Sequence, residues 1–331
     1  MKLEYLAFTA QGMELAAALA RALGGTPARC GAPEGLASWT ARAFRQAEGL
    51  VFVGAAGIAV RAIAPHVRSK AADPAVVVVD EAGRFAIPLL SGHLGGANDL
   101  ARRIAALLGG QAVLTTATDV RGAFAVDAWA RHQGCAVVNP AAIRRVSAKL
   151  LAGQAIALRT DWPPAGEPPP GVLLAQGADC DVRVTLRPEQ TDALVLVPRI
   201  AVLGVGCRRG TPQAALEAAF SALLARGDLR PQAVRKACSL DRKQDEPGLL
   251  AFCRAHGFPL ETFGAPALRA VPGDFAASPF VERVTGVDNV CERSAVLGSG
   301  GEILVKKQAG NGVTMALALA PYSPDWRWKD E

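Results

Sequence analysis

The sequence predicts an α/β fold in which two α/β lobes with mainly parallel sheets are joined by a small middle region. Strand-like apolar runs alternate with helical stretches along most of the 331 residues, as in layered α/β proteins. The run AVVVV at 75–79 is apolar throughout, as expected of a parallel strand covered on both faces. A chain of this length has room for about two domains, each with its own core.

Apolar periodicity places an N-terminal α/β domain at residues 1–130. Glycine pairs at 24–25 and 109–110 end two of its helices, because glycine adopts the left-handed conformation that commonly follows a helix. The strands that we expect are 3–8, 50–53, 75–79 and 112–114, and the helices are 14–23, 98–108 and 126–132.

A proline-rich segment marks the middle region. Residues 161–171 contain five prolines and two glycines, which disrupt helices and central strands, so we expect a loop there. The middle region is placed at 131–198, with short strands at 172–174, 182–186 and 194–197.

A second α/β domain is expected at 199–331. Its strands are placed at 200–205, 303–305 and 313–319, and its helices at 212–227 and 248–256. Thr211 suits the N-cap of the first helix and Pro212 its first turn.

Charge and cysteine content narrow the class of protein. The net charge is +6, and residues 1–160 hold 17 basic and 10 acidic side chains, so the first half should attract an anion. The basic residues are scattered and lack an aromatic stacking pattern, which argues against nucleic-acid binding.

There is no run of eighteen apolar residues that could cross a membrane. The seven cysteines include no Cys-x-x-Cys pair, which predicts a reduced, cytoplasmic chain without disulfides.

The densest polar cluster is SGHLGGAND at 91–99, between a strand-like segment and a helix. Its glycines let the backbone approach a ligand, and amides at the following helix start attract anions. The spacing matches neither the dinucleotide nor the phosphate-loop pattern. His93 could exchange a proton near neutral pH, or it could be a turn histidine satisfied by backbone groups.

Further polar residues follow other predicted strands. TTATD at 115–119 comes directly after one strand, and Asp80 and Glu81 end another. Because ligands of open α/β sheets bind beyond the carboxyl ends of strands, we expect these groups and 91–99 to share one sheet edge. Each could also be only a turn or a helix cap. Basic side chains after a further strand form either an anion-binding cleft or an ordinary solvated face: Arg61, Arg68 and Lys70.

The C-terminal domain carries three compact polar groups. In GVGCRRGT at 204–211, Cys207 could be a nucleophile, because a helix start and neighbouring arginines lower the pKa of a thiol. No histidine partner is evident, so a turn that holds an anion is the favoured interpretation. DRKQDE at 241–246 and TGVDNVCE at 285–292 could contact a ligand or could cap turns.

Taken together, these motifs resemble the cobalt-precorrin-5A hydrolase family of anaerobic cobalamin biosynthesis. The N-terminal part of the resemblance lies in DPAVVVVDEAGRFAIPLLSGHLGGANDLARRIA and TTATD. The C-terminal part lies in GVGCRRGT, DRKQDEPGL, TGVDNVCERSA and LVKKQAGNGVTMALA. The motifs appear in the family's order over residues 45–320.

The resemblance implies a hydrolase that acts on a carbon–carbon bond of a cobalt-containing, ring-contracted tetrapyrrole. Water would open the ring A δ-lactone, and the C20 carbon with its methyl group would leave as acetaldehyde, giving cobalt-precorrin-5B. The cobalt arrives with the substrate, so no cofactor and no protein-bound metal are expected. The partner is a polycarboxylate cobalt-corrin intermediate, which suits a basic first half. A homodimer and transient contacts with neighbouring pathway enzymes stay open.

The alternative function is a non-catalytic protein that binds a corrin intermediate or hands it on, because relatives of the second domain exist as separate proteins. In the enzymatic interpretation His93 moves the proton, with Glu81 or Asp119 orienting it. The substrate contacts expected in the N-terminal domain are Gly57, Arg61, Lys70, Ser91, Gly92, Gly95, Gly96, Asn98, Thr115 and Thr116. Those expected in the C-terminal domain are Gly206, Cys207, Arg208, Lys243, Glu246, Thr285, Gly286, Glu292 and Lys306.

Overall fold

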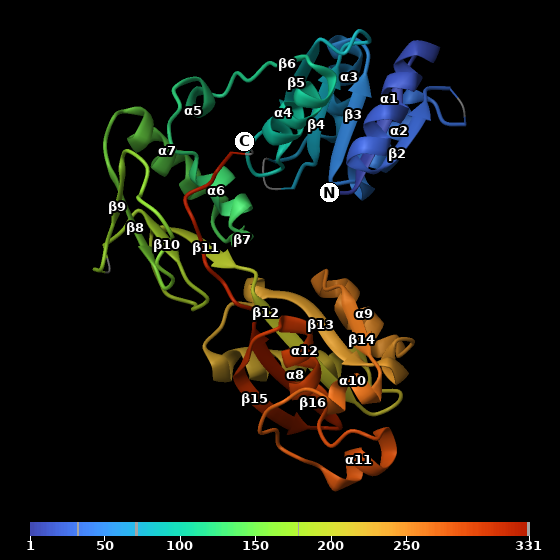
Figure 1. Ribbon diagram of the computed structural model, residues 1–331, viewed down its shortest axis with the longest axis vertical. Coiled ribbons are helices and arrows are strands. Elements are labelled where there is room, and N and C mark those ends of the chain that lie inside the picture. The colour runs from blue at the N-terminus through green and yellow to red at the C-terminus, as the bar shows by residue number, and fades with distance from the viewer. Residues whose placement is uncertain (32, 70–71, 178, 330–331) are drawn as a thin grey trace.

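Three α/β units, each with its own sheet, make up the protein (Figure 1). The computed structural model describes residues 1–31, 33–69, 72–177 and 179–329. The predicted α/β class with mainly parallel sheets is confirmed. The middle region is more than a connector, because it has a sheet and an apolar core of its own. No helix in the described part of the chain has the length and apolar character needed to cross a membrane.

The N-terminal sheet has the strand order β2-β1-β3-β4-β5-β6. Its strands are β1 (Leu3–Ala7), β2 (Thr26–Arg29), β3 (Gly49–Val53), β4 (Ala75–Val79), β5 (Phe85–Leu90) and β6 (Gln111–Ala112). Helices cover both faces: α1 (Ala10–Leu23) and α4 (Ala97–Leu108) on one, α2 (Leu36–Gln46) and α3 (Ala56–Ile63) on the other. All five residues of β4 are buried between these layers, as the apolar run predicted.

The direction of β5 corrects one expectation about the sheet edge. Strands β1 to β4 are parallel, but β5 is antiparallel to β4, and β6 follows the direction of β5. The reversal occurs in a short turn, in which the Phe85 amide donates to Asp80 Oδ1 at 2.6 Å. SGHLGGAND and TTATD therefore lie at one edge, whereas Asp80 and Glu81 lie at the opposite edge.

The middle sheet has the order β7-β11-β10-β8-β9, with β7 the antiparallel strand. Its strands are β7 (Cys135–Val137), β8 (Ile156–Thr160), β9 (Val172–Leu174), β10 (Val182–Val184) and β11 (Leu194–Pro198). The helices before and beside it are α5 (Ala117–Val120), α6 (Val126–His132) and α7 (Ile143–Leu151). The proline-rich segment joins β8 to β9, so prediction and structure agree on that connection.

The C-terminal sheet has the order β14-β13-β12-β16-β15. Its strands are β12 (Ala201–Cys207), β13 (Val234–Leu240), β14 (Leu260–Phe263), β15 (Glu302–Gly310) and β16 (Val313–Leu319). Its helices are α8 (Gln213–Gly227), α9 (Pro247–His256), α10 (Ala265–Arg269), α11 (Pro279–Thr285) and α12 (Val290–Ser299). Short 3-10 turns occupy Ala64–His66, Pro140–Ala142, Pro231–Ala233 and Asp241–Lys243. The N-cap of α8 is Pro212 and not Thr211, whose hydroxyl instead donates to the Arg208 carbonyl at 2.8 Å.

The chain after β16 leaves its own sheet and packs on the middle unit. Trp326 stacks on Trp129 with ring centroids 5.6 Å apart, and Phe124 contacts both Trp326 and Trp328. The Trp129 indole donates to the Asp325 carbonyl at 2.6 Å. These last residues, which we expected in the C-terminal domain, therefore complete the core of the middle unit.

Candidate active site

His93 lies between two carboxylates in the loop that joins β5 to α4. Its Nε2 is 2.8 Å from Asp119 Oδ2, and its Nδ1 is 3.2 Å from Asp127 Oδ1. Asp119 was expected to orient His93, and the structure brings the two side chains together. Asp127, in the first turn of α6, was not predicted.

The Asp119 carboxylate is held by residues from two elements. Asn98 Nδ2 donates to it at 2.8 Å, and Thr116 and Arg102 also bond to it. Asn98 is buried at the start of α4, and Thr116 directly precedes α5. The two sequence motifs therefore meet on one carboxylate, because β5 and β6 end at the same sheet edge.

The electrostatics of this cluster favour a charged imidazole. Burial by itself lowers the pKa of His93, but its hydrogen bonds to Asp119 and Asp127 outweigh burial and raise the pKa to about 9. Burial likewise acts to raise the pKa of Asp119, but the bonds from His93 and Thr116 hold that pKa well below its usual range. Near neutral pH the site is an imidazolium flanked by carboxylates, and both ring nitrogens are occupied. This state suits a proton donor better than a base.

The loop around His93 is bonded to itself rather than open to an anion. The amides of Gly96, Ala97 and Asn98 donate to the carbonyls of His93, Ser91 and Gly92. The expectation that these helix-start amides hold an anion is therefore wrong. Ser91 is buried and donates to the Asp73 carbonyl at 2.9 Å, so its hydroxyl is turned toward the protein.

The loop glycines are needed for close packing. A Cβ on Gly92 would lie 2.7 Å from Asn98 Oδ1, and one on Gly95 would lie 2.5 Å from the Ser91 Cβ. Gly96 has φ of +84° and faces the Arg131 guanidinium. These glycines shape the loop that carries His93.

Other predicted N-terminal residues lie away from this cluster. Glu81 accepts from Thr9 at the opposite sheet edge, so it does not orient His93. Gly57 and Arg61 lie in α3, which follows the end of β3 at that same opposite edge, and the Arg61 guanidinium donates to the Gly57 carbonyl. Thr115 is exposed beside Thr116. Lys70 lies outside the described residues.

A second set of ionic groups lies next to the His93 cluster. Asp99 is buried and pairs with Arg102 at 2.7 Å, with His132 at 3.1 Å and with Arg131. These ion pairs were not predicted from the sequence. One available signal was the helical spacing of Asp127 and Arg131, which puts both side chains on one face of the predicted helix 126–132. Arg102 contacts both Asp99 and Asp119, so it joins the two groups.

An open cavity of about 600 Å³ begins at the end of α6. It is lined by His132 and Gln133 and by the returning C-terminal tail, including Arg327 and Lys329. Because His132 belongs to the Asp99 set, this cavity lies beside the ionic cluster.

In the C-terminal domain the structure brings two of the predicted motifs together. The Gly210 amide donates to Glu246 Oε1 at 2.6 Å, and Lys243 Nζ is 3.1 Å from Glu246 Oε2. Cys207 is half-buried beside them, and burial raises the pKa of its thiol despite the nearby Lys243. The thiol form is therefore favoured, and the lowering of the thiol pKa that was expected from the helix start and the neighbouring arginines is not found. Arg208 is exposed at the same edge.

Glycines in the first C-terminal motif serve packing. A Cβ on Gly204 would lie 1.7 Å from the Cys291 carbonyl oxygen, and one on Gly206 would lie 2.5 Å from Thr314 Oγ1. The sheet can therefore accept α12 and the Thr314 side chain only with glycine here. The structure gives Gly206 a packing role.

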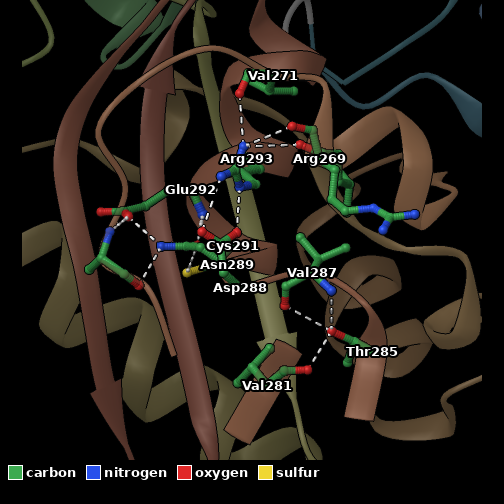
Figure 2. A network of polar contacts seen from close by, with 12 residues as sticks. Arg269, Val271, Val281, Thr285, Val287, Asp288, Asn289, Cys291, Glu292 and Arg293 are labelled. Carbon is green, nitrogen blue, oxygen red and sulfur yellow. Dashed lines mark hydrogen bonds and ion pairs between the residues drawn. The ribbon is translucent and has the colours of Figure 1, made fainter. Parts of the chain in front are cut away.

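The third motif forms a buried hydrogen-bond network, shown in Figure 2. Glu292 is 2% exposed; one oxygen accepts from the Lys307 amide at 2.8 Å, and the other accepts from Ala276 and Asn289. Thr285 bonds to the Val281 and Val287 carbonyls at the end of α11, where Gly286 adopts a left-handed conformation. Glu292 and Thr285 thus hold the domain's own loops, and Lys306 is exposed.

Three family models match consecutive parts of the chain. They describe the N-terminal part of cobalamin synthesis protein G at residues 38–119, the cobalamin biosynthesis central region at 124–198 and the protein G C-terminus at 201–318. The second model begins just before α6, so Asp127 falls in a different segment from His93 and Asp119.

Curated relatives cover most of the chain. The sequence is 36% identical over 310 residues to the cobalt-precorrin-5A hydrolase of Salmonella typhimurium, which covers 86% of both proteins. It is 32% identical over 305 residues to that of Priestia megaterium, covering 84% of this chain and 80% of the relative. A solved cobalamin biosynthesis protein G homolog from Sulfolobus solfataricus aligns over 97% of each chain, with a TM-score of 0.44 and 20% identity. On these identities and coverages, the chain belongs to the cobalt-precorrin-5A hydrolase family, whose enzymes are hydrolases of cobalamin biosynthesis.

Proposed function

We propose that this protein hydrolyses cobalt-precorrin-5A, opening the ring A δ-lactone and releasing acetaldehyde to give cobalt-precorrin-5B. The observation that carries the proposal is the convergence of two family motifs on the contact between His93 and Asp119. Similarity to two cobalt-precorrin-5A hydrolases over 86% and 84% of the chain supports the substrate.

The chemistry divides into two events. Water adds to the lactone carbonyl, the ring C–O bond breaks, and a carboxylate and the C20 hydroxyl result. The hydroxyl then loses its proton, the bond between C20 and the macrocycle breaks, and acetaldehyde leaves. The electron pair of the broken bond stays on the macrocycle and takes up a proton. Cobalt belongs to the substrate in this scheme, and no protein-bound metal or cofactor is invoked.

His93 is assigned to the second event. As an imidazolium with a pKa raised to about 9, it can supply the proton that the macrocycle takes up at neutral pH. Assisting carbon–carbon cleavage suits this charge state, whereas activating water as a base does not. Asp119 orients the ring through Nε2. Arg327 and Lys329 beside the cavity could pair with peripheral carboxylates of the corrin.

Anaerobic incubation with cobalt-precorrin-5A tests the proposal, with acetaldehyde trapped and the tetrapyrrole mass measured. The wild type should release acetaldehyde repeatedly, and His93→Gln should lower kcat about 100-fold or more, because the positioned proton donor is lost. His256→Gln is the matched control, since His256 also pairs with a carboxylate, Glu217 at 2.7 Å, but lies in the C-terminal domain.

Two results would contradict the proposal. Acetaldehyde release by His93→Gln at the wild-type rate would remove histidine from the mechanism. A stoichiometric coloured complex with an unchanged tetrapyrrole mass would favour the carrier function.

A further inference from the structure

We infer that Asp127 is a positioning residue for His93, and that the candidate active site is therefore assembled from the N-terminal domain and the middle unit together. The inference rests on the proposed role of His93 as a proton donor. It adds a carboxylate that the family motifs of the N-terminal domain do not contain.

Asp127 lies on a helix that packs in the core of the middle unit. Its neighbours Val126 and Trp129 are buried in the core of the middle unit, and Trp129 is covered by Trp326. The Ala128 amide donates to Asp127 Oδ1, the same oxygen that lies 3.2 Å from His93 Nδ1. The Asp127 side chain is 14% exposed, so little water competes for the contact.

The second carboxylate defines the orientation of the imidazole. With Asp119 at Nε2 and Asp127 at Nδ1, a half-turn of the ring would place C–H groups against both carboxylates and lose both hydrogen bonds. With Asp119 alone, one nitrogen loses its partner and the ring is less constrained. Holding a proton donor in a single orientation is what a positioning residue contributes to catalysis.

The charge state of His93 depends on the same pair. Asp119 faces it from α5, while Arg102 and Asp99 lie nearby on α4, and Arg131 and His132 lie on α6. The Asp119 carboxylate pairs with both His93 and Arg102, so its charge does not act on His93 alone. Asp127 therefore supplies a substantial part of the negative potential that keeps the imidazole protonated.

The full-length protein without substrate provides the direct test. The chain has four histidines, so His93→Gln identifies the His93 signal in an NMR titration. Asp127→Asn should lower the pKa of His93 by about one unit or more, because a neutral amide replaces a carboxylate at Nδ1. Asp127→Glu should recover most of the shift. Asp181→Asn is the matched control: Asp181 is also in the middle unit and also 14% exposed, but pairs with Lys149.

Turnover provides a second measurement. Asp127→Asn should shift the high-pH limb of kcat for acetaldehyde release to lower pH by the same amount, with KM unchanged. A folded Asp127→Asn protein whose His93 titrates as in the wild type would overturn the inference. Failure of the wild type to release acetaldehyde would overturn the proposed function instead, and that result is distinguishable because the titration uses no substrate.

Discussion

At the scale of single residues, the central feature is a histidine whose two ring nitrogens are both engaged by carboxylates. A histidine in a polar loop is recognisable in the sequence, but its charge state is not. Asp119 and Asp127 approach from different helices, and their joint effect overcomes the cost of burying a cation. The role that fits His93 changes accordingly, from an agent that could take or give a proton to one that gives it.

The same contacts predict how stability depends on pH. The folded-state pKa of His93, about 9, exceeds the unfolded value near 6.5, so its stabilising contribution is complete below pH 6.5 and is lost as pH rises through 9. We expect the free energy of unfolding of the wild type to fall by about 2 to 3 kcal/mol over that window, relative to His93→Gln. Urea titrations at a series of pH values measure the difference. Parallel pH curves for the two proteins would contradict the prediction.

Glycines in the motifs of the two outer domains serve close packing. In both domains the glycine-rich motifs look like cradles for a ligand, but the space above Gly204 holds the Cys291 carbonyl and that beside Gly92 holds Asn98. The glycine requirement is therefore explained by close packing at these positions.

At the scale of elements, the C-terminal tail packs into the core of the middle unit. Residues 325–328 contribute Trp326 and Trp328 to a core that also contains Phe124 and Trp129. Because α6 carries Asp127 and packs under this tail, the tail supports the candidate site from a distance of about 200 positions in sequence.

Trp326→Ala tests this dependence. Removing a buried indole should cost about 3 to 5 kcal/mol of stability in the middle unit and expose Trp129 to solvent. Thermal unfolding and the wavelength of tryptophan fluorescence measure the two effects. Phe280→Ala, which truncates a side chain that is 63% exposed, should change neither. An unchanged unfolding temperature in Trp326→Ala would show that the tail does not stabilise the unit.

At the scale of the whole molecule, charge is unevenly distributed along the chain. Residues 1–160 carry 17 basic and 10 acidic side chains, but many arginines are paired internally, as Arg42 and Arg102 are. The exposed Arg61 lies at the sheet edge opposite the His93 loop, whereas the amide of the exposed Arg68 donates to Asp73, whose carbonyl accepts from Ser91 in that loop. We therefore expect the basic residues outside the His93 loop to attract an anionic substrate at long range.

This distribution predicts a salt-dependent KM. Raising KCl from about 50 to 300 mM shortens the screening length, so the KM for the polycarboxylate substrate should rise several-fold while kcat stays constant. Steady-state acetaldehyde release measures both constants, and sucrose at matched viscosity is the control. A KM that is insensitive to salt would show that the net charge has no part in substrate capture.

The sequence by itself determined the α/β class, part of the elements in the two outer units and several residues of the candidate site. It did not predict α2 and α3 in the N-terminal unit, or β13, β14 and α10 to α12 in the C-terminal unit. Some of these predictions depend only on neighbouring residues, such as the apolar run at 75–79 and the glycines after the helices. Such patterns can be recognised without tertiary information. The helix Val126–His132 has the predicted bounds for the same reason. Two short motifs also contain residues of the candidate site, which can therefore be picked out from the local sequence: His93, Asn98, Thr116 and Asp119.

Only the tertiary structure decided which of these residues meet. The antiparallel direction of β5 separates Glu81 from His93, and no local pattern reports strand direction. Asp127 and the tail tryptophans reach the site region through the packing of the middle unit, whose core joins residues far apart in sequence. The charge of His93 follows from that packing, since a pKa depends on the groups that surround a side chain in space.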